Sequence, residues 1–271
     1  MYLDHFGLKE KPFEPTADPK YIWLSEENAR ALKVLREAFI KDEGYLVLSG
    51  DAGAGKNALM NRFVKLVEKK SHSAMIWDPS VEPLEFFNLL ALEFRINWIF
   101  DTKEEFLHHF KSLVENASLN HLKLLIVIDE SQNLKPELLQ ELNQLLDIRI
   151  NRKKYVNILF LIQTKEPDNL FGGNSTSLKK RIIGRHHVEH LSQEDTCRLV
   201  EHRLKVSGAA RQIFTREALH EIFLFSGGCP RLINLICDHA LLTGYAAGLT
   251  VIDHSIVATC ATDLQISNLA L

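Results

Sequence analysis

The alternation of hydrophobic and polar positions predicts strands and helices in turn over the first two thirds of the chain. Four short apolar runs have the length and composition of buried parallel strands, at residues 45–48, 74–77, 124–128 and 157–162. Between and before them, apolar residues recur at helical spacing over residues 25–40, 57–69, 83–94, 103–117 and 137–146. This order indicates an α/β fold with a parallel sheet that helices cover on both faces.

The pattern changes after Arg185, where only helices are predicted, over residues 192–207, 215–226, 229–245 and 253–262. Ser192 and Thr215 are expected N-caps, and Gly227 is expected to end the second of these helices. We therefore predict two domains. Residues 1–190 form the α/β domain, with an N-terminal extension over residues 1–43, and residues 191–271 form a smaller helical domain.

A glycine-rich segment follows the first strand and precedes a helix, and it fits the pattern GxxxxGK. Glycines let the backbone N–H groups wrap closely around a phosphate, and the helix N-terminus faces the same anion. Lys56 is then expected to reach the outer phosphates of ATP. The predicted nucleotide contacts are Gly50, Asp51, Ala52, Gly53, Ala54, Gly55, Lys56, Asn57 and Ala58.

Asn57 departs from this motif, which calls for Ser or Thr to ligate Mg²⁺ after the lysine. An asparagine carbonyl oxygen can hold a hard cation, but it is neutral and lies on a longer side chain. Phosphate binding is therefore expected to survive, whereas placement of Mg²⁺, and with it turnover, is put in question.

Two acidic residues, Asp129 and Glu130, end the third apolar run. About seventy residues after a phosphate loop, such a pair supports one mechanism of triphosphate hydrolysis. Asp129 is the expected Mg²⁺ ligand together with Asn57, and Glu130 is the expected general base.

Charge and composition narrow the class of protein. Lys and Arg number 32 against 35 Asp and Glu, so the net charge is −3, and 46% of residues are hydrophobic, as in ordinary globular proteins. A uniformly basic nucleic-acid sleeve is excluded, although the runs 149–154 and 179–181 are locally basic. Without a signal-peptide pattern or an apolar run that could span a bilayer, and with cysteines expected as free thiols, we expect a cytoplasmic protein without an integral membrane segment.

Several further stretches resemble one family, the AAA+ ATPases of the ExeA type, which are associated with general secretion and grouped with some transposition ATPases. They are Phe6-Gly7-Leu8, Pro12-Phe13, Asp18-Pro19, the run from Asp129 to Leu134, the run from Lys180 to Arg185, and the run from Gly228 to Asn234. The resemblance covers nearly the whole chain. It implies a P-loop AAA+ core with a C-terminal helical lid.

The same resemblance implies roles for three more residues. Gln163, at the end of the fourth strand, corresponds to the polar sensor near the γ-phosphate and the attacking water. Arg181 corresponds to an arginine finger that is donated across a subunit interface. Arg231 corresponds to a second sensor that contacts the nucleotide from the helical lid.

Together these features predict an oligomeric switch, a ring or a filament of copies of this chain, that uses ATP and Mg²⁺ in the assembly of a larger protein machine. Two alternatives remain open. One is a DNA-binding ATPase of the transposition target-selection type, with double-stranded DNA as partner, and the other is a nucleotide-binding scaffold that does not hydrolyse ATP.

Overall fold

The computed structural model describes residues 2–16, 18–163 and 179–266, and it falls into two compact units. The α/β unit comprises Asn28–Asp51 and Leu59–Val188. The helical unit comprises the described parts of Met1–Glu27, Ala52–Ala58 and Glu189–Leu271. The sequence had suggested that the first 43 residues extend the α/β domain, whereas the contacts group residues up to Glu27 with the helices.

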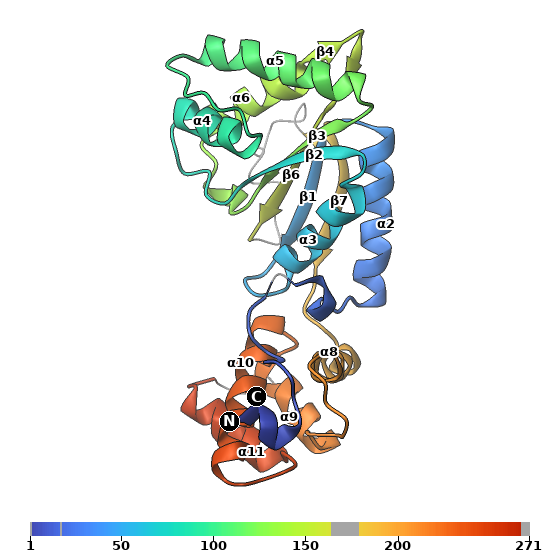
Figure 1. Ribbon diagram of the computed structural model, residues 1–271, viewed down its shortest axis with the longest axis vertical. Helices are drawn as coiled ribbons and strands as arrows, with labels where there is room; N and C mark the ends of the chain where they lie inside the picture. The colour runs from blue at the N-terminus through green and yellow to red at the C-terminus, as the bar shows by residue number, and fades with distance from the viewer. Residues whose placement is uncertain (1, 17, 164–178, 267–271) are drawn as a thin grey trace. The chain divides into compact units, whose positions relative to one another are not determined.

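The α/β unit is built on a parallel sheet, as predicted. Among the described residues the sheet has five strands in the order β2-β3-β6-β1-β7 (Figure 1). Their bounds are β1 (Tyr45–Gly50), β2 (Ser71–Ile76), β3 (Lys123–Ile128), β6 (Val156–Ile162) and β7 (Ile182–Val188). β1 and β6 are buried at every residue, which is typical of parallel strands covered on both faces.

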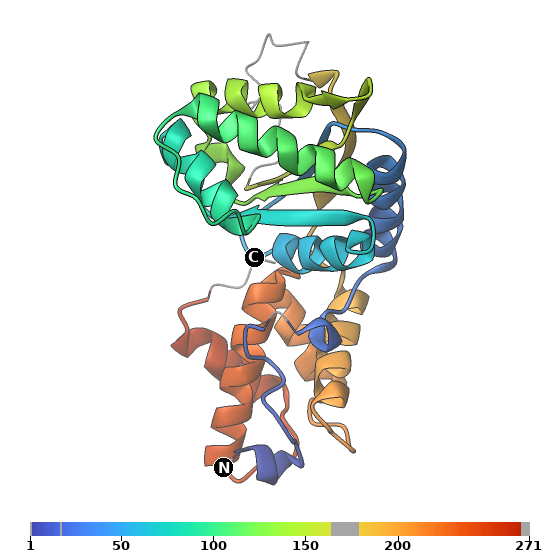
Figure 2. The same ribbon diagram turned by 45° about the horizontal axis from the view of Figure 1, so that its top comes forward.

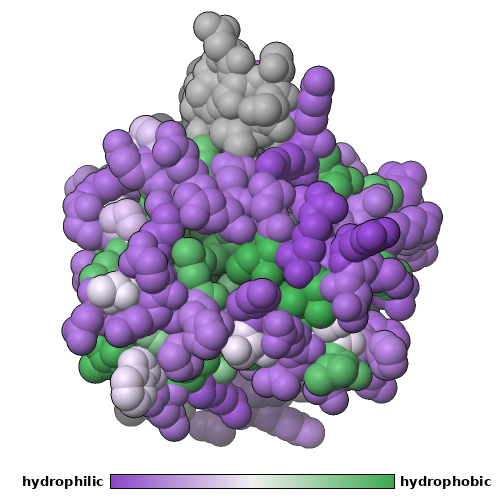
Figure 3. All heavy atoms as spheres, turned by 90° about the horizontal axis from the view of Figure 1, so that it is seen from above, coloured by the Kyte–Doolittle hydropathy of each residue, from purple (hydrophilic) through white to green (hydrophobic). Residues whose placement is uncertain are grey.

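Helices cover both faces of this sheet, so the fold class predicted from the sequence is confirmed (Figures 1 and 2). α2 (Glu26–Lys41) and α3 (Lys56–Val67) lie on one face, where the rings of Phe39 and Phe63 meet edge to face at 6.1 Å. α4 (Pro83–Glu93), α5 (Lys103–Leu119) and α6 (Pro136–Asp147) lie on the other, where Phe87 stacks on Phe106 at 4.5 Å. Seen from above, this unit presents mainly hydrophilic side chains, with hydrophobic ones gathered in a central hollow (Figure 3).

The sequence analysis missed the edge strand β7 and the small antiparallel hairpin of β4 (Arg149–Ile150) and β5 (Lys153–Lys154). Six of the seven residues of β7 are only partly buried or exposed, so the strand lacks the apolar run that revealed the others. Gly184 belongs there because a Cβ atom would lie 3.0 Å from Leu46 and 3.2 Å from Leu35, where α2 packs closely.

The helical unit contains α8 (Gln193–Val206), α9 (Arg216–Ser226), α10 (Pro230–Ala246) and α11 (His254–Asp263). The predicted caps are present: Ser192 Oγ accepts from the N–H of Asp195 and Thr215 Oγ1 from that of Ala218, both at 3.1 Å. Gly227 ends α9 in the left-handed conformation. Within the described ranges, no helix is long and apolar enough to cross a membrane.

The N-terminal segment, with α1 (Tyr2–Phe6) and the 3₁₀ turn η1 (Pro19–Tyr21), packs into the core of the helical unit. Phe13 is 2% exposed and meets Phe214 edge to face. Arg203 of α8 is also buried, and its Nη1 donates to the carbonyl oxygen of Pro12 at 3.1 Å. The segment is thus an integral layer of this unit rather than an appendage of the sheet.

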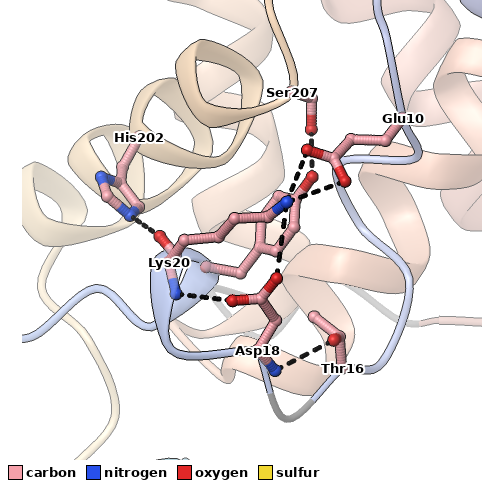
Figure 4. Close-up of polar contacts among 7 residues, drawn as sticks. Glu10, Thr16, Asp18, Lys20, His202 and Ser207 are labelled. Carbon is pink, nitrogen blue, oxygen red and sulfur yellow. Dashed lines mark hydrogen bonds and ion pairs between the residues drawn. The ribbon is translucent and has the colours of Figure 1, made fainter.

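Polar contacts join the segment to α8 as well (Figure 4). Lys20 Nζ donates to both carboxylate oxygens of Glu10, at 2.7 and 2.9 Å. The carbonyl oxygen of Lys20 lies 2.8 Å from His202 Nε2, and the Tyr21 hydroxyl lies 2.9 Å from Ser207 Oγ. The contacts of Lys20 with His202 and of Tyr21 with Ser207 hold η1 against α8.

Replacing Phe13 with alanine is expected to lower the free energy of unfolding of the helical unit by about 3–5 kcal/mol, because a large aromatic side chain leaves a buried cavity. Hydrogen exchange should then increase in α8, α9 and α10 first. Glu14→Ala is the control, since that side chain is 60% exposed. Faster exchange confined to the strands of the sheet would contradict the packing described here.

Candidate functional site

The glycine-rich loop joins the buried strand β1 to α3, which begins at Lys56. Gly50, Gly53 and Gly55 have φ values of +151°, +81° and +102°, which residues with a Cβ rarely adopt. A Cβ on Gly50 would also lie 2.6 Å from the carbonyl oxygen of Val188. The local geometry therefore requires glycine and leaves a backbone loop that leads directly into a helix N-terminus.

Such a loop fits a phosphate group. The first N–H groups of α3 have no partner within the helix, and the positive end of the helix dipole lies in the same place. Lys56 is 8% exposed at the first position of α3, and Asn57 follows it with an exposed side chain. The donors predicted from the sequence are thus gathered in one short segment.

Residues 52–58 belong to the same compact unit as α10 and contact its N-terminus. The N–H of Arg231 lies 3.4 Å from the carbonyl oxygen of Gly53, and Cys229 Sγ lies 3.8 Å from that of Ala52. A Cβ on Gly53 would come within 2.9 Å of both Cys229 Sγ and the Cβ of Arg231. The structure therefore brings the backbone of Arg231 beside Gly53 of the glycine loop.

The acidic pair lies at the carboxyl end of β3 in the α/β unit. Asp129 is 7% exposed; its N–H donates to Ile76 O, and its Oδ1 accepts from the N–H of Glu130 at 2.9 Å. Glu130 has φ +46° and ψ +38°, a left-handed conformation that non-glycine residues adopt at a cost. Because of this backbone turn, the carboxylates of Asp129 and Glu130 have different surroundings although the two residues are adjacent in sequence.

Glu130 and Gln163 meet across neighbouring strands. Gln163 Nε2 donates to Glu130 Oε1 at 3.3 Å, and the other carboxylate oxygen of Glu130 accepts from Gln132 Nε2. Gln132 Oε1 in turn accepts from the N–H of Gln163 at 3.0 Å. Gln132 was given no role from the sequence, and its place in the acidic run at the end of β3 was the signal that could have found it.

Arg181 lies at the amino-terminal ends of the strands, whereas the acidic pair lies at their carboxyl ends. Its carbonyl oxygen accepts from the N–H of Tyr45, the first residue of β1, and it directly precedes β7. The strand registers place Ile182 level with Ile126, three residues before Asp129. At strand spacings this puts Arg181 and Asp129 on the order of 20 Å apart, beyond the reach of one side chain.

The guanidinium of Arg181 is held by α6. Its Nη2 donates to Asp147 Oδ2 at 2.8 Å, and Lys154 Nζ donates to the other carboxylate oxygen at 2.7 Å. Although burial alone would raise the pKa of Asp147, these two hydrogen bonds hold it below its ordinary value. In the described part of the chain, Arg181 Nη1 is buried without a hydrogen-bond partner. The side chain is 33% exposed, so part of it remains accessible.

The residues expected to hold Mg²⁺ offer oxygen ligands of the kind this ion takes. Asp129 supplies a mostly buried carboxylate, and Asn57 supplies an amide oxygen in the first turn of α3. Mg²⁺ usually takes one or two protein ligands and completes its shell with phosphate oxygens and water. Each residue by itself therefore offers a donor of the type that this ion takes, and the neutral amide of Asn57 is the weaker type.

Comparison with known proteins agrees with this fold. A family model described as an AAA domain matches residues 39–171. The Aeropyrum pernix ORC2 protein in its ADP form has a TM-score of 0.76 at 15% identity, covering 94% of this chain and 73% of that one. Cdc6p from Pyrobaculum aerophilum has a TM-score of 0.73 at 17% identity, covering 93% and 70%. Structural likeness at such identities shows the fold alone, and the fold is that of the AAA+ class.

The sequence relationship narrows the class. The chain is 31% identical over 269 residues to general secretion pathway protein A of Aeromonas hydrophila, a match that covers 98% of this chain and 49% of that protein. Together with the AAA domain match, this relationship supports an AAA+ ATPase of the ExeA type, as the sequence motifs predicted. It spans about half the length of the curated relative it matches.

Proposed function

We propose that this chain binds and hydrolyses ATP, and that it does so in an assembly of several copies. The observation that carries the proposal is the cluster of Glu130, Gln132 and Gln163 at the carboxyl ends of β3 and β6. β1, which leads into the glycine loop, is the next strand of the same sheet and runs parallel to β6. The strands that carry the glycine motif and the acidic pair therefore end on the same side of the sheet.

In this proposal the loop from Gly50 to Ala58 holds the phosphates through backbone N–H groups and Lys56, and Arg231 contacts the nucleotide from α10. Asp129 and Asn57 would hold Mg²⁺, which neutralises charge on the phosphate oxygens when it is bound. Each of these contacts binds or orients the nucleotide. Their loss should therefore lower the affinity for the nucleotide more than the rate of proton transfer.

Glu130 is the proposed general base, because its carboxylate lies at the edge where the γ-phosphate would be attacked. The hydrogen bonds from Gln132 and Gln163 occupy a lone pair on each carboxylate oxygen and fix the orientation of the group. An amide that already touches Glu130 is well placed to orient a water between the base and the phosphate. Gln163 would therefore serve as a positioning group rather than as a base.

Completion of the site requires a second copy of the chain. Arg181 lies too far from Asp129 to act in its own subunit, and arginine is suited to stabilise phosphate charge because it is planar and permanently charged. Its ion pair with Asp147 would have to be exchanged for the neighbour's phosphate. Nucleotide state could thereby control a ring or a filament, and such an assembly could drive a larger protein machine.

The name of the curated relative, general secretion pathway protein A, motivates a secretion machine as the partner of this chain. A scaffold that binds nucleotide without turnover is the second candidate. Asn57 favours it, since this residue replaces the hydroxyl group expected beside Mg²⁺.

Lys56→Ala is expected to weaken ATP binding by about 1.5–3 kcal/mol, the range for a lost hydrogen bond to a charged group. Isothermal titration calorimetry with ATP and Mg²⁺ measures this difference. Lys65→Ala is the matched control, because Lys65 lies on the same helix and pairs with the exposed Glu68. Equal affinities of the wild type and Lys56→Ala would show that the loop is not the nucleotide site.

Asn57→Thr is expected to raise the rate of ATP hydrolysis, because a hydroxyl oxygen would replace a longer neutral amide beside Asp129. Mg²⁺ tolerates misplaced ligands poorly, since it requires near-octahedral coordination at about 2.0–2.1 Å. Adding Glu130→Gln should abolish hydrolysis in either background and spare binding. Phosphate release at matched Mg²⁺ tests both substitutions. If wild type and Asn57→Thr release phosphate at the same rate, Asn57 is not the weak point of the metal site.

A further inference from the structure

A basic cleft of about 660 Å³ lies at the amino-terminal ends of the strands, whereas the proposed nucleotide site lies at their carboxyl ends. It is formed where β1, β3 and β6 begin, next to the β4–β5 hairpin. Six of its lining residues are Lys or Arg and only Glu43 is acidic; the six are Lys41, Lys123, Arg149, Arg152, Lys153 and Lys154. This concentration of charge contrasts with the net charge of −3 of the whole chain.

Half of these cations already have partners. Lys123 Nζ pairs with Glu43 at 2.8 Å and donates to carbonyl oxygens at the end of α2. Lys154 pairs with Asp147, and Lys41 lies 3.6 Å from Glu37. Within the described ranges, no ion pair engages Arg149, Arg152 or Lys153, and all three side chains are exposed. The hairpin therefore carries the cations that can bind a ligand.

The β4–β5 hairpin holds like charges close together and has a turn residue that is unfavourable for its backbone conformation. Arg149 and Lys154 lie directly opposite each other across the two strands, where like charges repel. The two-residue turn has Asn151 at φ +50° and Arg152 at φ +67°. Such turns strongly prefer glycine at the second position, yet an arginine occupies it. Both features disfavour the isolated hairpin, and a bound polyanion would reduce the repulsion between its charges.

We propose that this cleft and the β4–β5 hairpin bind the phosphate backbone of double-stranded DNA. The cleft presents several cations, since Arg149, Arg152 and Lys153 all line it without an ion pair among the described residues, and several cations suit a backbone of successive phosphates. Exposed Lys and Arg side chains supply binding that is independent of base sequence. A membrane surface fits less well, because the turn and second strand of the hairpin, residues 151–154, are Asn, Arg, Lys and Lys, and the apolar lining of the cleft is limited to Ile40, Leu122 and Tyr155.

This DNA site is separate from the proposed nucleotide site. Lys123 is the first residue of β3 and Asp129 follows its last, so the two sites lie about one strand length apart. The hairpin is nevertheless connected to the proposed finger, since Lys154 and Arg181 share the carboxylate of Asp147. DNA that draws Lys154 away from Asp147 would weaken the hold on Arg181.

The test is fluorescence anisotropy of a labelled 30-base-pair duplex, with the full chain, between 50 and 200 mM salt. Arg152→Gly is the first variant, because it removes one cation and relieves the left-handed strain, so it should fold at least as well as the wild type. We expect weaker binding and a salt dependence that is less steep by about 0.9 in log K against log salt. The pair Arg149→Glu and Lys153→Glu should lower the steepness by about 1.8.

The matched control is the pair Arg30→Glu and Lys33→Glu, two exposed cations in the first half of α2. This variant should bind the duplex like the wild type. The proposal is overturned if the wild type does not bind the duplex at 50 mM salt, if the cleft variants bind as the control does, or if the wild type binds only anionic phosphatidylserine vesicles. ATP affinity measured on the same variants should be unchanged, so a failure here is distinguishable from a failure of the nucleotide site.

Discussion

Parallel hydrogen bonding of β1, β3 and β6 is the constraint on which the remaining features of the α/β unit depend. Parallel strands send all their carboxyl ends to one side of the sheet, so β1 ends at Gly50, the first residue of the glycine-rich motif, on the same side as β3 ends before Asp129 and Glu130. The apolar side chains that bury both faces of these strands fix the register. A shift of one residue would turn every side chain of a strand to the opposite face, and the contact between Glu130 and Gln163 would be lost.

The same constraint separates Arg181 from the acids. Because Arg181 precedes β7, it lies at the amino edge, beside Asp147 and the β4–β5 hairpin. One edge thus carries the groups proposed to bind and attack a nucleotide, and the other carries cations proposed to serve a neighbouring subunit and DNA. Asp147 contacts both Arg181, the proposed finger, and Lys154 of the proposed DNA site. It therefore links the contact to a neighbouring subunit with the contact to DNA.

The sequence predicted β1, β2, β3 and β6 because each contains a continuous apolar run, and it predicted the helix caps because their side chains act locally. It did not predict β7, since residues 184–187 of this edge strand are Gly, Arg, His and His and interrupt any apolar run. It also did not place the N-terminal segment, because the contacts of Phe13 and Pro12 are with residues about two hundred positions away. Among site residues, Gln132 and Asp147 escaped notice because their importance arises from contacts with residues distant in sequence, Gln163 for Gln132 and Arg181 for Asp147.

The most direct test of the central claim, that an active site needs residues from two copies, is to mix two inactive variants. Glu130→Gln retains Arg181 but lacks the base, and Arg181→Ala retains the base but lacks the finger. Phosphate release should be low for each alone and should recover on mixing to about a quarter of the wild-type rate, the fraction of head-to-tail interfaces that pair an intact base with an intact finger. A mixture no more active than the average of the two variants, or an Arg181→Ala variant as active as the wild type, would contradict the account.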